Sequence, residues 1–81
     1  MVKVKALLVK QQGEVRHREG LTVAQALEGA KVSVPQGGAV TVYRMDGRNV
    51  AGERSVAAGD LATALVADNE VVVVTPPVAN G

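Results

Sequence analysis

The chain has 81 residues, a formal net charge of +1 and no cysteine. A chain of this length forms one domain, and without cysteine it has no disulfide framework, cysteine-ligated zinc site or thiol nucleophile. Apolar residues make up 47% of the chain, but the only aromatic residue is Tyr43. Aliphatic side chains must therefore build the core, because a domain this small depends on efficient apolar burial.

The N-terminal segment MVKVKALLVK is basic but lacks a long apolar core and a small-residue cleavage site. It therefore does not match a secretory signal. The sequence also lacks a stretch near the roughly 20 apolar residues that cross a bilayer. We expect a soluble, cytoplasmic protein that does not bind membranes.

The segment 2–10 begins with alternating valine and lysine. This period of two predicts a half-buried strand. Residues 11–13 are expected to form a turn. Residues 14–19 are expected to run back as a polar strand at the sheet edge, where charged side chains discourage further pairing.

Residues 21–29 carry the clearest helix signal. Thr22 and Gln25 have the spacing of a capping box, in which side chain and backbone at the helix start satisfy each other. The apolar residues that follow can share one buried face. Gly29 is expected to end this short helix.

The middle of the chain predicts a hairpin. Residues 32–38 are an irregular connection that ends in a turn, and residues 39–45 are rich in β-forming side chains. Asp46 and Gly47 then form a tight-turn signal. Residues 48–50 are expected to be a short returning strand.

A loop over 51–67, with one helical turn near 61–64, is expected to lead into the last strand. Residues 70–75 contain four successive valines. A valine run without alternation predicts a strand that is central or covered on both faces. Proline has no N–H and cannot continue a central strand, so residues 76–81 should leave the body as an extended tail.

These elements predict an α+β fold with one helix on one face of a mixed sheet of four to five strands. The first and last strands are the most apolar and are expected to lie side by side in the centre. This is the plan of the β-grasp (ubiquitin-like) fold. The domain would cover 1–75 and the tail 76–81.

The segment DNEVVVVTPPVANG, from Asp68 to Gly81, resembles the C-terminus of ubiquitin-like sulfur carriers. That family includes the small subunit of molybdopterin synthase and the thiamine-biosynthesis sulfur carrier. The family ends in Gly-Gly, whereas this chain has Asn80 before Gly81. The resemblance implies that an ATP-dependent partner enzyme activates the Gly81 carboxylate for thiocarboxylate or isopeptide formation. The tail that threads into this enzyme would comprise Pro76, Pro77, Val78, Ala79 and Asn80.

A second hypothesis is a β-grasp interaction module, or the small subunit of a larger assembly, with an inert tail. Its partner would dock on the open sheet face, where alternation brings basic and apolar side chains together. The candidate docking residues are Lys3, Lys5, Tyr43, Val71 and Val73.

Nucleic-acid binding is a third hypothesis, since several basic side chains can share that face, among them Arg44. The net charge of +1 and the single aromatic residue argue against it, because single-strand binders combine a basic groove with stacking aromatics.

The sequence contains no pattern typical of an enzyme. His17 is the only histidine, lies among charged residues and is expected to be solvated. The acidic residues are placed as turns require and do not predict a carboxylate pair; they include Asp46, Asp60, Asp68 and Glu70. We therefore expect no catalytic residue, metal or cofactor in this chain.

Overall fold

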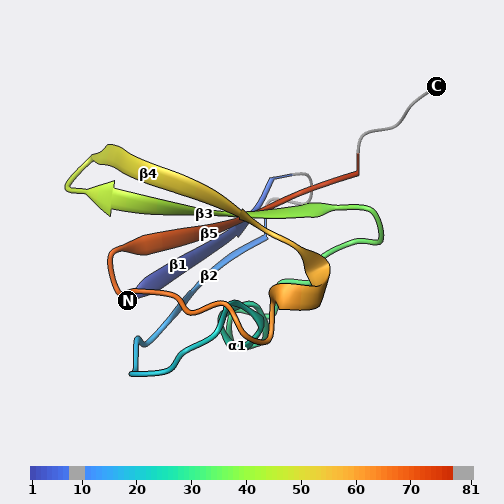
Figure 1. The fold of residues 1–81 in the computed structure, drawn as a ribbon, viewed down its shortest axis with the longest axis horizontal. Helices are drawn as coiled ribbons and strands as arrows, with labels where there is room; N and C mark the ends of the chain where they lie inside the picture. The colour runs from blue at the N-terminus through green and yellow to red at the C-terminus, as the bar shows by residue number, and fades with distance from the viewer. Residues whose placement is uncertain (8–10, 78–81) are drawn as a thin grey trace.

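A mixed sheet with the strand order β2-β1-β5-β3-β4 forms one layer of the computed structural model (Figure 1). The structure describes residues 1–7 and 11–77. Within these residues one α-helix packs on the sheet. The elements are β1 (Val2–Ala6), β2 (Gln11–Val15), α1 (Val23–Gly29), β3 (Ala39–Asp46), β4 (Asn49–Val56), the 3-10 helix η1 (Ala58–Asp60) and β5 (Glu70–Thr75).

The first and last strands lie side by side, as predicted, and run parallel. The other neighbouring pairs are antiparallel. This small α+β arrangement is consistent with a β-grasp-like fold. Because β1 and β5 are parallel, the N-terminus and the start of β5 lie at one end of the molecule and the end of β5 at the other (Figure 1).

Valine alternation builds the core. Val4, Val42 and Val72 come from the three central strands and are fully buried on the side of the sheet where α1 packs. The neighbouring Val71 and Val73 are only half-buried. The strand β5 is therefore central but covered on one face alone, since no described element lies over the other face.

The capping box predicted at the helix start is confirmed. The Gln25 N–H donates to Thr22 Oγ1 at 3.2 Å. In return, the Thr22 N–H donates to Gln25 Oε1 at 3.1 Å. These bonds satisfy backbone donors that a helix start would otherwise leave unpaired.

The prediction that the helix ends at Gly29 is confirmed, because α1 covers Val23–Gly29. After the helix, Lys31 adopts the left-handed conformation at φ 59°, and the Val32 N–H donates to the Leu27 carbonyl at 3.0 Å. This is the bond pattern of a Schellman motif. Gly29 also allows the helix end to approach β2 closely, because a Cβ there would lie 3.1 Å from a methyl carbon of Val15.

The expected turn at 11–13 is wrong, because these residues already belong to β2 (Gln11–Val15). Gly13 pairs with Val4, and a Cβ there would lie 2.9 Å from the Ala30 Cβ. The glycine is required by the close approach of the helix end to the strand. The strand expected over 14–19 accordingly starts and ends earlier.

The returning strand of the hairpin is longer than the predicted 48–50. It runs as β4 over Asn49–Val56, with a register irregularity between Arg44 and Met45. The single helical turn expected near 61–64 is present directly after η1 (Ala58–Asp60), where the Ala64 N–H donates to the Asp60 carbonyl at 2.8 Å.

Candidate functional site at the open sheet face and the tail root

The chain leaves the sheet after Thr75, as the prolines predict. The Thr75 hydroxyl donates to the Ala39 carbonyl at 3.3 Å, across the last pair of β5 and β3. Pro76 follows half-buried and Pro77 exposed. The remaining tail residues predicted to act, Val78, Ala79, Asn80 and Gly81, lie outside the described residues.

The face of the sheet opposite α1 carries all five predicted docking residues. Lys3 pairs with Val71, and Val71 pairs with Tyr43. Lys5 pairs with Val73 in the next row. Because paired residues point to the same face, the structure brings these side chains together. The apolar members are half-buried and the lysines are exposed.

Met45 and Val50 extend this apolar surface, and the sequence interpretation missed both. They pair with each other on β3 and β4, and Val50 is 57% exposed. Because side chains alternate between the two faces along a strand, Met45 is expected on the same face of the sheet as Tyr43. The position of Val50 depends on the hairpin register after the irregularity. We call the apolar set Tyr43, Met45, Val50, Val71 and Val73 the open-face strip.

The lysines separate the open-face strip from a shallow polar hollow along β1 and β2. Lys3 pairs with Glu14, and Lys5 pairs with Gln12. These four residues line the hollow together with Val4 and Gly13. The face is therefore apolar over β3 and β5 and polar toward β2.

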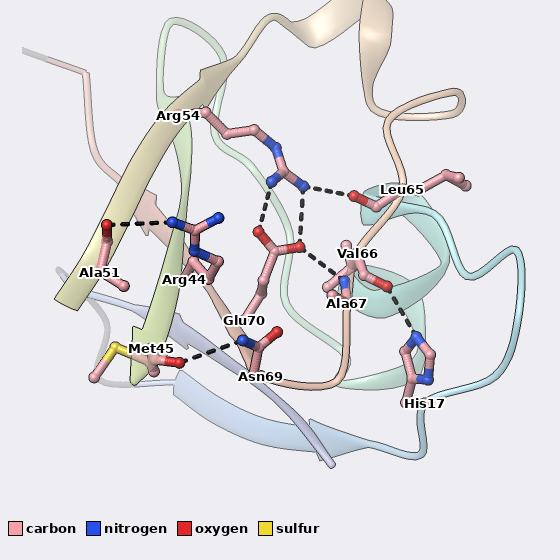
Figure 2. A network of polar contacts seen from close by, with 10 residues as sticks. All are labelled: His17, Arg44, Met45, Ala51, Arg54, Leu65, Val66, Ala67, Asn69 and Glu70. Atoms are coloured by element: carbon pink, nitrogen blue, oxygen red, sulfur yellow. Dashed lines mark hydrogen bonds and ion pairs between the residues drawn. The ribbon is translucent and has the colours of Figure 1, made fainter. Parts of the chain in front are cut away.

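An ion pair between a buried carboxylate and a partly exposed arginine lies at the start of β5 and was not predicted. Glu70 is only 5% exposed. Arg54 donates to its carboxylate at 2.5 and 3.2 Å, and the Ala67 N–H donates at 2.8 Å (Figure 2). Arg54 also donates to the Leu65 carbonyl at 2.6 Å. This network ties β4 and the preceding loop to the start of β5.

Arg44 lies on the helix side of the sheet, not on the open face. It pairs with Glu70 and Gly52 and donates to the Ala51 carbonyl at 3.5 Å (Figure 2). The basic surface required for nucleic-acid binding on the open face therefore lacks one of its expected members.

His17 and Asp68 both make contacts at the N-terminal end of β5. The half-buried His17 donates from Nε2 to the Val66 carbonyl at 3.1 Å, so its predicted solvated position is wrong. The Met1 ammonium lies 2.8 Å from Asp68 Oδ1. The hydrogen bond from this ammonium, followed by its charge, lowers the pKa of Asp68 below the ordinary 3.8.

In the part of the chain that the structure describes, no group of three His, Cys, Asp or Glu side chains could hold a metal ion. Asp68 and Glu70 each have a cationic partner. Each of these two carboxylates is therefore paired with a cation and not with another acidic side chain.

Comparisons with protein-family models, curated proteins and solved structures find no match for the chain. No helix in the described segments is long and apolar enough to cross a membrane.

Proposed function

We propose that the chain is a ubiquitin-like sulfur carrier or protein modifier with a β-grasp fold. The carrying observation is that the chain leaves a central strand through Pro76 and Pro77. The resemblance of residues 68–81 to the sulfur carriers then assigns the reacting glycine to Gly81. Proline stops the sheet ladder, and glycine at the reacting position presents the least steric obstruction. These features suit a terminal carboxylate that enters the active site of another protein.

The chemistry would be carried out by an ATP-dependent activating enzyme, which also favours a cytoplasmic setting. The Gly81 carboxylate attacks the α-phosphorus of ATP, so an acyl adenylate forms and pyrophosphate leaves. Hydrosulfide can then displace AMP to give a thiocarboxylate. Alternatively, an amine displaces AMP to give an amide, with loss of a proton. The carrier contributes the carboxylate and a surface for recognition.

Intact-mass measurement of the protein purified from its native host tests this proposal. We expect a form in which one sulfur replaces one oxygen, or a covalent adduct, and we expect deletion of Gly81 to abolish both. Asn80→Gly restores the family's Gly-Gly ending and should increase the modified fraction. An unmodified mass in every condition, with full function after Gly81 deletion, would contradict the proposal.

A docking module without tail chemistry is the second candidate, favoured by the open-face strip. Apolar side chains beside Lys3 and Lys5 suit a partner, such as a larger subunit, with an apolar centre and acidic rim. In this case Val73→Glu should abolish co-purification with the native partner, whereas Gly81 deletion should leave it unchanged. Ser33→Glu adds the same charge at an exposed position outside the sheet, between α1 and β3, and is the matched control.

A further inference from the structure

The turn over residues 35–38 lies directly against the start of the tail. We call residues 75–77 the tail root. A Cβ placed on Gly38 would lie 2.8 Å from the Thr75 carbonyl oxygen and 3.0 Å from Pro35. A Cβ placed on Gly37 would lie 3.2 Å from the Pro77 Cβ. Neither glycine therefore has room for a side chain unless the tail root or the turn moves.

The local sequence explains the shape of this turn. The Gly38 N–H donates to the Pro35 carbonyl at 2.8 Å, and Gly37 has a φ of +80°. A positive φ at the third position matches a type II turn and favours glycine. The turn is thus held by its own hydrogen bond and presents a glycine surface to Pro77.

The ladder between β3 and β5 stops where the turn meets the tail. Pro76 has no N–H to donate, and the Gly38 N–H is used within its own turn. Beyond the pair of Ala39 and Thr75, neither Pro76 nor Gly38 therefore offers an N–H for a hydrogen bond between β3 and the tail. The contact between the turn and Pro77 is the next described constraint on its direction.

We infer that the 35–38 turn supports the start of the tail and sets the direction in which the chain leaves the body at Pro76 and Pro77. Resting on the proposed function, Gly37 and Gly38 are positioning residues for activation of the Gly81 carboxylate. They act through Thr75 and Pro77, since a displaced root changes where the reacting end is presented.

The chain offers matched controls for both substitutions. Gly20 has a φ of +82° and nothing within 4 Å of its Cβ position. Gly20→Ala therefore imposes the same backbone strain as Gly37→Ala without the tail contact. Gly59 also has nothing within 4 Å, so Gly59→Ala controls for Gly38→Ala. Pro77→Gly removes the contact from the tail side and leaves the turn intact.

A nitroxide label on Ala79→Cys tests this role of the turn without any partner, because the chain has no other cysteine. The measurement is paramagnetic broadening of backbone amide signals. We expect broadening concentrated on one side of the body, and a changed pattern with Gly37→Ala, Gly38→Ala or Pro77→Gly. Gly20→Ala and Gly59→Ala should preserve the pattern. Even broadening in the parent, or the same pattern in all variants, would overturn the inference.

Thermal unfolding of each variant shows whether the body is folded. If Gly38→Ala does not fold, Pro77→Gly still decides the outcome, because Pro77 is exposed.

Activation kinetics test the functional consequence. With the activating enzyme of the native host, ATP–pyrophosphate exchange should fall about tenfold in kcat/KM for Gly37→Ala, because small misplacements of reacting groups are costly. Gly20→Ala should match the parent. Activation of the parent with equal rates in all variants would overturn the positioning role. No activation of the parent would contradict the proposed function, while the label experiment would still decide whether the turn directs the tail.

Discussion

The two ends of β5 are built in different ways. At its start, the Glu70 carboxylate accepts hydrogen bonds from Arg54 and Ala67, and the N-terminal ammonium contacts Asp68. At its end, the Thr75 hydroxyl makes one hydrogen bond to Ala39. The residues that lie beside Thr75 and Pro77 there are Gly38 and Gly37, which have no side chain to make polar contacts.

This difference indicates a division of roles along one strand. A buried carboxylate needs a cationic partner and hydrogen bonds to be tolerated, so the start of β5 is tied to its surroundings. The prolines at the other end remove donors and release the chain from the sheet. Mutations at the start should therefore affect stability most, and mutations at the end should affect tail placement.

Arg54→Met should have the largest effect on stability, lowering the free energy of unfolding by about 3 kcal/mol. The buried Glu70 carboxylate would lose its cationic partner. The value lies at the low end for a buried pair because the Arg54 side chain is 45% exposed. Urea denaturation measures the change, and Arg44→Met, which removes one 3.5 Å contact, is the control. Equal losses for the two arginines would contradict the asymmetry.

Glu70→Gln should cost less, about 1–2 kcal/mol. The amide keeps the shape and an acceptor for the Ala67 N–H, and the partly exposed Arg54 can still reach water. A double-mutant cycle with Arg54→Met measures the coupling. Additive losses would show that the pair does not act as a unit.

Thr75→Val at the other end should lower stability by only about 0.5 kcal/mol. It removes an exposed hydrogen bond to Ala39 and retains a β-branched side chain. Thr75→Ser keeps the hydroxyl and serves as the control in thermal unfolding. A loss as large as that of Arg54→Met would remove the difference between the ends.

Asp68→Asn should have the smallest effect at neutral pH, because Asp68 and Met1 are exposed. The ammonium lowers the pKa of Asp68 below 3.8, so the folded state favours the ionised carboxylate. The stabilisation is present above 3.8, shrinks as the pH falls past that value, and disappears below the lowered pKa. Unfolding of both proteins across this range measures it; a difference that grows toward acid would contradict the assignment.

Local patterns were sufficient where neighbouring residues decide the structure. The capping box at Thr22, the strand over 70–75 and the exit at Pro76 each depend on residues close in sequence. Alternation likewise placed Lys3 and Tyr43 on the open face.

Other predictions failed because the deciding contact is distant in sequence. Gly13 suggested a turn, but it lies within β2 and allows strand and helix to approach closely. His17 seemed solvated until the fold placed it beside Val66. The sequence did not indicate a partner for Glu70, because Arg54 lies in the part of β4 that was predicted to be a loop.

The sequence by itself determined the helix start, the aliphatic core and the exit of the tail, since capping, periodicity and proline chemistry act over a few residues. Only the tertiary structure decided how β5 is held at its start and what touches it at its end. Those features depend on strand register and packing, which bring residues 35–38 to the tail and Arg54 to Glu70.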